Sequence, residues 1–329
     1  MILAGDIGGT SARLAYFERK DGRLHVVAEE IKHSPSFPSL EAAVLEFTRK
    51  YNYLVKCACF GVAGPVNGGI VHTANLPWII ESAVLERELG IATVHLINDL
   101  EANAHGLSEL SAEDFEVLAA GARASIGNAA VISAGTGLGE AGLYWDGVNH
   151  HPFACEGGHA DFAPANDLQC QLWSYLHKKF AGHVSWERVL SGPGQLNIYE
   201  FLRDTGKATE EPWLREEMLA GDASAVISQN GISGKSEICE QAVNVFVEIY
   251  GAAAGNLALK LLATGGIYLG GGIAPKILPK LKELRFVRAF CDKGRLSPLL
   301  ELIPVRVVLN EQTALLGAAH VAMLKAEQA

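Results

Sequence analysis

The sequence has few cysteines, and their spacing matches no common metal or disulfide pattern. Six cysteines occur in 329 residues, without a Cys-x-x-Cys pair. Structural zinc sites and small secreted scaffolds need a denser or more regular arrangement. We therefore expect reduced thiols that pack against other side chains, no zinc, and a cytoplasmic protein.

Long apolar runs and an excess of positive charge are also missing. No stretch of 18 apolar residues occurs, and the first apolar run is short and lacks a basic leader, which argues against a membrane span or a signal peptide. Acidic residues outnumber basic residues 37 to 27, for a net charge of -10. Such a surface repels nucleic acid and anionic membranes, so we expect neither as a partner.

Glycine is abundant, with 35 residues, and it separates strands and helices that alternate along the chain. Alternation of this kind predicts α/β layering. The first half predicts strands at 2–6, 12–18, 24–31, 56–64 and 93–99 and a helix over 39–51 with Ser39 as its cap. The second half predicts a strand, glycine turn and strand over 129–147, a helix over 236–263, a strand over 266–272, a helix from Pro275, a strand over 304–310 and a helix after Gln312.

The segment GDIGGTSARLAY, residues 5–16, joins its two strands through a turn with little side-chain bulk. A second strand, glycine turn and strand follows at 129–147, which indicates an internal duplication. Backbone N–H groups at such tips can approach a ligand closely, and phosphate oxygens gain most from several donors. One glycine turn alone is more often structural, whereas two could hold one polyphosphate.

Two familiar phosphate motifs do not fit. Gly137, Gly139 and Gly142 have the spacing of a dinucleotide-binding turn, but a strand follows them where that fold needs a helix. GISGKS at 231–236 resembles the end of a P-loop, yet Gln229 stands where the first glycine is required. We interpret Ser236 as the cap of the long helix.

Seven segments stand out along the chain: GDIGGTSARLAY, INDLEANAHG, SAGTGLGEA, EGGHADFAP, LSGPG, AAGNLAL and LGGGIAPK. Together they resemble the bacterial-type glucokinases of the actin-like ATPase superfamily. The likeness runs essentially from end to end, with the motifs in the family's order.

The resemblance implies a two-domain actin-like ATPase (ribonuclease H-like) fold, with duplicated mixed β-sheets flanked by helices and an interdomain cleft. We expect residues 1–109 plus 311–329 to form the small domain and 110–310 the large one. The implied activity is transfer of phosphate from ATP to the 6-hydroxyl of glucose, with Mg²⁺. We also expect a homodimer.

The resemblance assigns the glycine segments to the nucleotide. In the first phosphate motif, Asp6 would orient hydrated Mg²⁺, which favours carboxylate oxygens and keeps several waters. Ser11 departs from the asparagine usual in this family, which affects details of the phosphate contacts. The implied nucleotide residues are Asp6, Gly8, Gly9 and Thr10, then Gly135, Thr136 and Gly137, and, for adenosine, Gly270, Gly271 and Gly272.

The resemblance also implies a sugar site rich in acceptors, as a hexose with its many hydroxyl donors requires. The implied contacts are Asn98, Asp99, Glu156, His159 and Glu187, with Asn75 as a weaker candidate. The resemblance also implies that Asp99 is the catalytic base. It ends a predicted strand, where open α/β sheets bind ligands.

Other interpretations of these residues stay open. By itself, Asp99 could be only the N-cap of the following helix, and Trp78 could pack in the core or beside the sugar loop. His150 and His151 are expected in a solvated turn. Two functional alternatives remain: a kinase of another hexose, such as mannose, fructose or an N-acetylated amino sugar, or a sugar-sensing regulator without catalysis. The second would need a DNA-binding segment, for which Asp6 leaves no room in this sequence.

Overall fold

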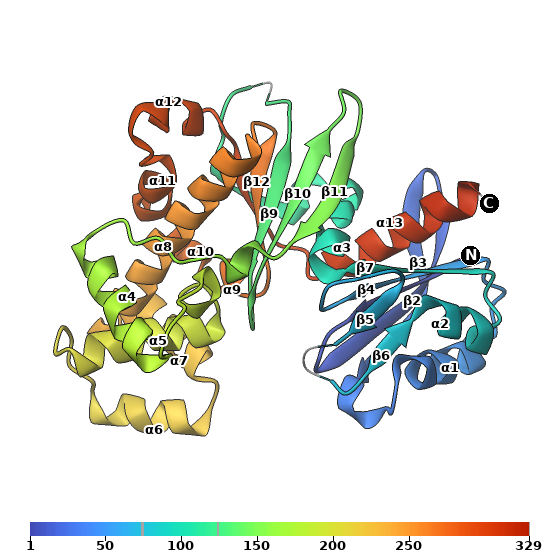
Figure 1. Cartoon of the computed structure of the whole chain (residues 1–329), viewed down its shortest axis with the longest axis horizontal. Helices are drawn as coiled ribbons and strands as arrows, with labels where there is room; N and C mark the ends of the chain where they lie inside the picture. Colours follow the sequence, from blue (N-terminus) through green and yellow to red (C-terminus); the bar gives the residue numbers. More distant parts are fainter. Residues whose placement is uncertain (74–75, 124, 329) are drawn as a thin grey trace. The chain divides into compact units, whose positions relative to one another are not determined.

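Figure 1 shows the computed structural model, which describes residues 1–73, 76–123 and 125–328. The chain forms two compact units. Unit 1 comprises Met1–Asp114, His151–Ala154 and Asn310–Ala329, and unit 2 comprises Phe115–His150 and Cys155–Leu309.

Unit 1 is built around a five-stranded sheet of order β3-β2-β1-β4-β7. The strand β1 runs antiparallel to β2 and parallel to β4, and β4 runs parallel to β7. The elements of unit 1 are β1 (Ile2–Ile7), β2 (Ser11–Lys20), β3 (Arg23–His33), α1 (Leu40–Tyr51), β4 (Cys57–Val62), β5 (Ile70–His72), β6 (Ile79–Glu81), α2 (Ser82–Leu89), β7 (Thr93–Asn98), α3 (Asp99–Gly106) and α13 (Thr313–Gln328).

Side chains alternate between the two faces of this sheet, and helices cover both. Leu3 and Ile7 of β1 pack in one apolar cluster with Phe47 of α1, while Ile2 and Ala4 pack in another with residues of α3 and α13. Successive residues of a strand point to opposite faces, so an almost wholly apolar β1 is what a sheet covered on both sides requires.

Unit 2 repeats the central part of this plan. Its strands follow the order β10-β9-β12-β13-β8. The strand β9 is antiparallel to β10 and parallel to β12, and β12 is parallel to β13, as in the series β2-β1-β4-β7. The predicted duplication is confirmed. The strand β11 (His150–Cys155) spans the division between the units, because His151–Ala154 group with unit 1.

Helices make up most of the remainder of unit 2. The long helix α8 is apolar and long enough to cross a membrane, but 72% of its most apolar window is buried within the protein, as expected of a core helix. The other elements are β8 (Phe115–Ala119), β9 (Ala129–Ala134), β10 (Leu138–Trp145), α4 (Asp167–Lys179), α5 (Gly192–Asp204), α6 (Pro212–Ala220), α7 (Ala223–Ile232), α8 (Glu237–Leu261), β12 (Gly266–Gly270), α9 (Ile273–Lys276), α10 (Leu278–Leu281), α11 (Leu284–Cys291), α12 (Ser297–Leu300) and β13 (Val305–Val308), with short 3₁₀ turns η4 (Gly157–His159) and η5 (Trp186–Arg188).

Several local predictions need correction. His150 and His151 begin β11 and do not lie in a turn; the imidazole of His150 bonds the carbonyl oxygen of Gly127 at 2.9 Å, which keeps it against unit 2. Ser236 stands at the start of α8, but its hydroxyl donates to Glu211 and caps no backbone N–H. The helix expected from Pro275 already begins at Ile273.

The cysteines and Trp78 also differ in part from expectation. All six cysteines are free thiols, but Cys155 and Cys170 are exposed and so do not pack in the core. Trp78 belongs to the core: it is 3% exposed and its indole N–H donates to the carbonyl oxygen of Phe37 at 3.2 Å.

Two glycines let α3 and α13 touch backbone to backbone. A Cβ atom on Gly317 would lie 1.7 Å from the carbonyl oxygen of Ala102, and one on Gly106 would lie 2.0 Å from that of Thr313. These distances are far shorter than a van der Waals contact. The position of α3, which begins at Asp99, therefore depends on the absence of side chains at this crossing.

We predict that Gly317→Ala destabilises the protein by about 1–3 kcal/mol or more, because backbone atoms must move to admit the methyl group. Gly221→Ala is the matched control: its Cβ would find no atom nearer than 3.7 Å, and its φ is -143°. Urea unfolding should show the loss only for Gly317→Ala. Equal stability of the two variants would contradict the close crossing.

Unit 1 contains a histidine whose charged form is disfavoured. Burial, the main cause, lowers the pKa of His105. Electrostatic interaction with the neighbouring His320 and His151 also lowers this pKa, to about 4 in all. The two rings of His105 and His320 lie 5.9 Å apart. Between about pH 6.5 and 4 the unfolded chain binds a proton at this position that the folded chain does not, so the free energy of unfolding must fall as the pH falls.

We predict that His105→Gln loses less stability than the wild type between pH 7 and pH 4.5, since the variant cannot take up this proton on unfolding. The exposed His25 supplies the control variant His25→Gln, which should follow the wild type. Urea titrations at several pH values measure the effect. A wild-type pH dependence in His105→Gln would show that His105 protonates equally in the folded and unfolded states.

Candidate functional site

The turn between β1 and β2 presents backbone donors. The N–H of Gly8 donates to the carbonyl of Ser11 at 2.9 Å, and Ser34 holds the carbonyls of Gly8 and Thr10 through its hydroxyl and its N–H. Among the residues that the structure describes, the N–H groups of Gly9 and Thr10 have no hydrogen-bond partner. A turn whose carbonyls are occupied and whose N–H groups remain available suits an anion.

Asp6 lies in β1 directly before this turn, opposite Arg13 of β2 and Gly61 of β4. Burial raises the pKa of Asp6, and the positive charge of Arg13 only partly opposes that effect. The Nε atom of Arg13 also lies 3.6 Å from a carboxylate oxygen of Glu29. The positive charge of Arg13 therefore serves two carboxylates, Asp6 and Glu29. A half-buried carboxylate in this position would gain from a divalent cation.

The junction of β7 and α3 is held by Asn98. Its amide oxygen accepts from the N–H groups of Leu100 and Glu101 at 2.9 and 3.3 Å, and its amide nitrogen donates to the carbonyl of Gly64 at 3.1 Å. Asn98 is thus the N-cap, and the open interpretation of Asp99 as the cap is wrong.

Asp99 is the first residue of α3, where a carboxylate interacts favourably with the helix dipole. Its Oδ1 accepts from the N–H of Leu100 at 3.0 Å. A Cβ on Gly61 would lie 2.8 Å from that of Ala102 and 3.9 Å from the Cα of Asp99, so Gly61 lets α3 begin close to the sheet.

The parallel strands place Asp99 at the same sheet edge as the glycine turn. Ile7 pairs with Val62, and Val62 pairs with Asn98, so the three strands end in one row. Two strand spacings separate β1 from β7, or about 10 Å. The turn after Ile7 and the carboxylate after Asn98 are therefore near neighbours in unit 1.

Unit 2 has the second glycine turn, between β9 and β10. The N–H of Gly135 donates to the carbonyl of Gly137 at 2.9 Å, and the N–H of Leu138 donates to Oε2 of Glu187 at 3.0 Å. A Cβ on Gly137 would lie 2.5 Å from that oxygen. Glycine at 137 is therefore needed for Glu187 to reach the turn.

The third glycine segment lies next to this turn. Gly270 pairs with Ser133 of β9, and Gly271 has φ +78° and would place a Cβ 2.3 Å from the carbonyl oxygen of Ala134. Unit 2 thus brings Gly270–Gly272, the segment expected to contact adenosine, beside Gly135–Gly137, the turn expected to contact phosphate. Thr136 is exposed between its two glycines.

Three sugar candidates also lie in one part of unit 2. His159 Nε2 is 3.9 Å from Glu156 Oε2, and both side chains are more than half exposed. The N–H of Trp186 donates to the carbonyl of Ala160 at 2.9 Å, which brings η5 and Glu187 beside η4. Asn75, the remaining candidate, lies outside the described residues.

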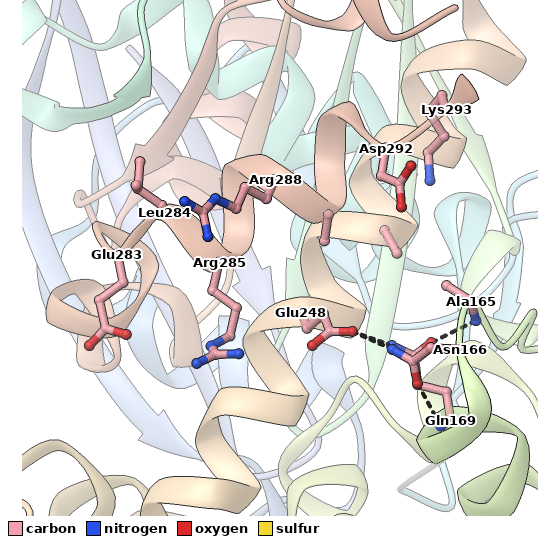
Figure 2. A pocket seen from close by; sticks show the side chains of 12 residues that line it. Ala165, Asn166, Gln169, Glu248, Glu283, Leu284, Arg285, Arg288, Asp292 and Lys293 are labelled. Carbon is pink, nitrogen blue, oxygen red and sulfur yellow. Dashed lines mark hydrogen bonds between the residues drawn. The ribbon is translucent and has the colours of Figure 1, made fainter. Parts of the chain in front are cut away.

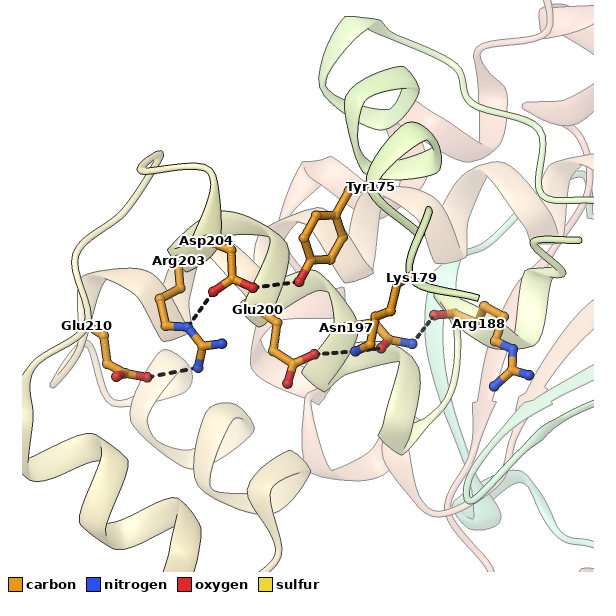
Figure 3. Close-up of polar contacts among 8 residues, drawn as sticks. All are labelled: Tyr175, Lys179, Arg188, Asn197, Glu200, Arg203, Asp204 and Glu210. Atoms are coloured by element: carbon orange, nitrogen blue, oxygen red, sulfur yellow. Dashed lines mark hydrogen bonds and ion pairs between the residues drawn. The ribbon is translucent and has the colours of Figure 1, made fainter. Parts of the chain in front are cut away.

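A polar network holds the turn that carries Glu187. The amide nitrogen of Asn197 donates to the carbonyl of Arg188 at 2.9 Å, and the ammonium group of Lys179 donates to the amide oxygen of Asn197 at 2.8 Å (Figure 3). Farther along α5, the hydroxyl of Tyr175 donates to Asp204 at 2.7 Å. Asn197 is 5% exposed, so its loss would remove a buried side chain that holds the carbonyl of Arg188.

Two residues that support the candidate site were not predicted from the sequence. The N–H of Gly192, at the start of α5, donates to the carbonyl of Gly135 at 2.8 Å; its signal was the capped Ser-Gly-Pro stretch within LSGPG. The second is Glu140, 6% exposed, whose pKa is raised by burial. A Cβ on Gly157 would lie 1.8 Å from its Oε2, so this carboxylate lies against the segment that carries Glu156 and His159.

Comparison with known proteins gives a consistent result. A family model described as Glucokinase matches residues 3–325. The glucokinase of Nostoc punctiforme (strain ATCC 29133 / PCC 73102) is 43% identical over 333 residues, which are 97% of this chain and 98% of the relative.

Solved structures share the fold. The crystal structure of a glucokinase from an Antarctic psychrotroph is 33% identical and superposes with a TM-score of 0.85, covering 98% of each chain. A ROK family glucokinase from Streptomyces griseus, in complex with glucose and AMPPNP, has a TM-score of 0.67 at 20% identity, over 98% of this chain and 99% of that one; it supports the fold alone. The predicted actin-like ATPase fold class is confirmed. The chain belongs to the glucokinase family, and it is an enzyme that phosphorylates glucose.

Proposed function

We propose that Asp99 is the catalytic base of this glucokinase, with ATP as the phosphate donor. The observation that carries the proposal is the common edge of β1, β4 and β7, where a donor-rich glycine turn and the carboxylate of Asp99 lie about two strand spacings apart. That separation suits a γ-phosphate at the turn and a hydroxyl at the carboxylate.

In the proposed reaction the 6-hydroxyl oxygen of glucose attacks the γ-phosphorus. The new O–P bond forms as the bond to the β-phosphate oxygen breaks, and ADP leaves with that electron pair. Asp99 accepts the hydroxyl proton. Phosphoryl transfer passes through a loose transition state in most analyses, so the positions of the groups and neutralisation of charge contribute more than a strong base.

The glycine segments would hold the nucleotide. In unit 1 the donors are the N–H groups of Gly9 and Thr10, with Gly8 forming the turn. In unit 2 the turn Gly135–Gly137 would contact phosphate, and Gly270–Gly272 would contact adenosine, since the two segments adjoin.

Asp6 fits a role in holding Mg²⁺ through water. No group of three candidate ligands occurs in the described ranges, whereas Mg²⁺ usually keeps several waters and uses one or two carboxylates plus substrate phosphates. The half-buried Asp6 carboxylate beside the phosphate turn supplies one such group. When bound, the ion would neutralise charge on the phosphates.

The sugar would be held by Asn98, Asp99, Glu156, His159 and Glu187. Support comes from the motif match and from the proximity of the last three in unit 2. Glu187 already accepts from Leu138 through one oxygen, which fixes the direction of the carboxylate and leaves its second oxygen for a hydroxyl. Asn98 caps α3 with its amide oxygen and donates one N–H to Gly64, so its second N–H would contact the sugar while the cap orients Asp99.

We further propose a small domain of residues 1–109 plus 311–329, a large domain of 110–310, a homodimer and a cytoplasmic location. The compact units described above lie close to these domain boundaries. A net charge of -10 and the free thiols suit a cytoplasmic setting.

We predict that Asp99→Asn folds and binds glucose but loses at least about 10²-fold in kcat, or roughly 3 kcal/mol of transition-state stabilisation, because the amide cannot accept the proton. A coupled assay of ADP release measures kcat, and calorimetry measures glucose binding.

Asp167→Asn is the matched control, since Asn166 and Asp167 start α4 as Asn98 and Asp99 start α3. This variant should keep wild-type turnover. Near wild-type turnover in Asp99→Asn would remove Asp99 from the role of base.

A further inference from the structure

Unit 2 contains a cavity whose lining includes none of the residues of the proposed active site. It has a volume of about 560 Å³ and is lined by the start of α4, the middle of α8 and the helix α11. Small-molecule sites commonly measure about 300–1,000 Å³, so the cavity is large enough for a metabolite. Figure 2 shows its lining side chains, most of which are polar or charged.

Three cations line this cavity: Arg285, Arg288 and Lys293. Arg285 and Arg288 lie one helical turn apart on α11, and Lys293 follows that helix. In the part of the chain that the structure describes, none of the three takes part in an ion pair or a side-chain hydrogen bond. Unpaired guanidinium groups on one helix face offer planar, two-pronged donors, which phosphate oxygens match well.

Lys293 is held in this position by the helix beneath it. A Cβ on Gly255 of α8 would lie 2.8 Å from its Cε, so the aliphatic stem lies where Gly255 has no side chain. Burial lowers the pKa of Lys293, and the adjacent Asp292 opposes that effect. A bound anion would stabilise the charged form.

Two acidic residues of the cavity, Glu283 and Glu248, already have polar partners. Glu283 pairs with Lys280 at 3.0 Å, outside the lining. Glu248 accepts through one oxygen from the amide nitrogens of Asn166 and Gln169, at 2.6 and 3.1 Å; Figure 2 shows these three side chains together, with Lys293 on another part of the wall. The second oxygen of Glu248 can accept from a hydroxyl group. The amide oxygen of Asn166 caps α4 by accepting from the N–H of Gln169 at 3.0 Å, and its second lone pair can accept from another hydroxyl.

We propose that this cavity binds a phosphorylated sugar, with its phosphate at Arg285 and Arg288 and its hydroxyls at Glu248 and Asn166, while Lys293 adds positive charge on another part of the wall. A ligand that is anionic at one end and rich in hydroxyl donors at the other matches both walls. The lining carboxylates Asp292 and Glu283 would repel the phosphate, although Glu283 is paired with Lys280, so the arginine pair must carry most of the binding. The inference uses none of the residues proposed for catalysis.

The test is calorimetric titration with fructose 6-phosphate, in the presence of saturating glucose and a non-hydrolysable ATP analogue so that the active site is occupied. The wild type should bind one molecule per chain. The double variant R285Q/R288Q should bind at least about 10-fold more weakly, as expected for the loss of charge-assisted hydrogen bonds. R295Q, which removes an exposed arginine outside the cavity, should bind like the wild type.

Three results would overturn the proposal: no saturable binding to the wild type, unchanged affinity in R285Q/R288Q, or an equal loss in R295Q. Inorganic phosphate should bind at least about 10-fold more weakly than the sugar phosphate, and equal affinities would refute the role of Glu248 and Asn166. Glucose phosphorylation by R285Q/R288Q should stay near the wild-type rate, which shows that it folds. If that rate falls, the single variants R285Q and R288Q provide the same comparison.

Discussion

The close approach of backbone to backbone at glycine is the constraint on which the rest of the structure depends. Because Gly61 has no side chain, the start of α3 can lie close to the sheet. Gly106 and Gly317 likewise let α13 pack against α3. In unit 2, Gly271 admits the end of β12 to the carbonyl of Ala134. A Cβ atom at any of these positions would clash with a neighbouring atom, so each contact requires glycine in the sequence.

These contacts have a chemical consequence, because they place polar groups where strands end. A sheet covered on both faces leaves its strand ends as the accessible sites. Parallel strands β1, β4 and β7 end in register, and the polar residues that follow them therefore share an edge. The carboxylates of Asp6 and Asp99 and the N–H groups of the first glycine turn are brought together by this register, although the turn and Asp99 are far apart in sequence.

Much of this arrangement could be predicted from the sequence. Alternation of apolar residues, glycine turns and caps predicted the five strands of the first sheet and β9, β10, β12 and β13 of the second, but neither β8 nor β11. The two glycine turns indicated the duplication. The motifs gave the family, which a match over residues 3–325 confirms. The roles of the individual site residues and the domain boundaries remain predictions.

What escaped prediction depends on contacts between distant segments. His150 and His151 are polar and come soon after Asp146 and Gly147, which is typical of a turn, but they belong to β11. Serine is a common N-cap residue, yet the hydroxyl of Ser236 donates to the carboxylate of Glu211 instead of capping the helix. Glu140 lies in an apolar strand without any local signal, and only the approach of Gly157 shows its importance. The cavity beside α11 is assembled from three helices, so periodicity within one helix could not indicate it.

A crystal structure with glucose and a non-hydrolysable ATP analogue would test the central claim most directly. The account predicts phosphate oxygens within about 2.7–3.2 Å of the N–H groups of Gly9 or Thr10, and the glucose 6-hydroxyl within hydrogen-bond distance of the Asp99 carboxylate. Phosphates bound away from that turn, or a 6-hydroxyl that faces a different carboxylate, would contradict it.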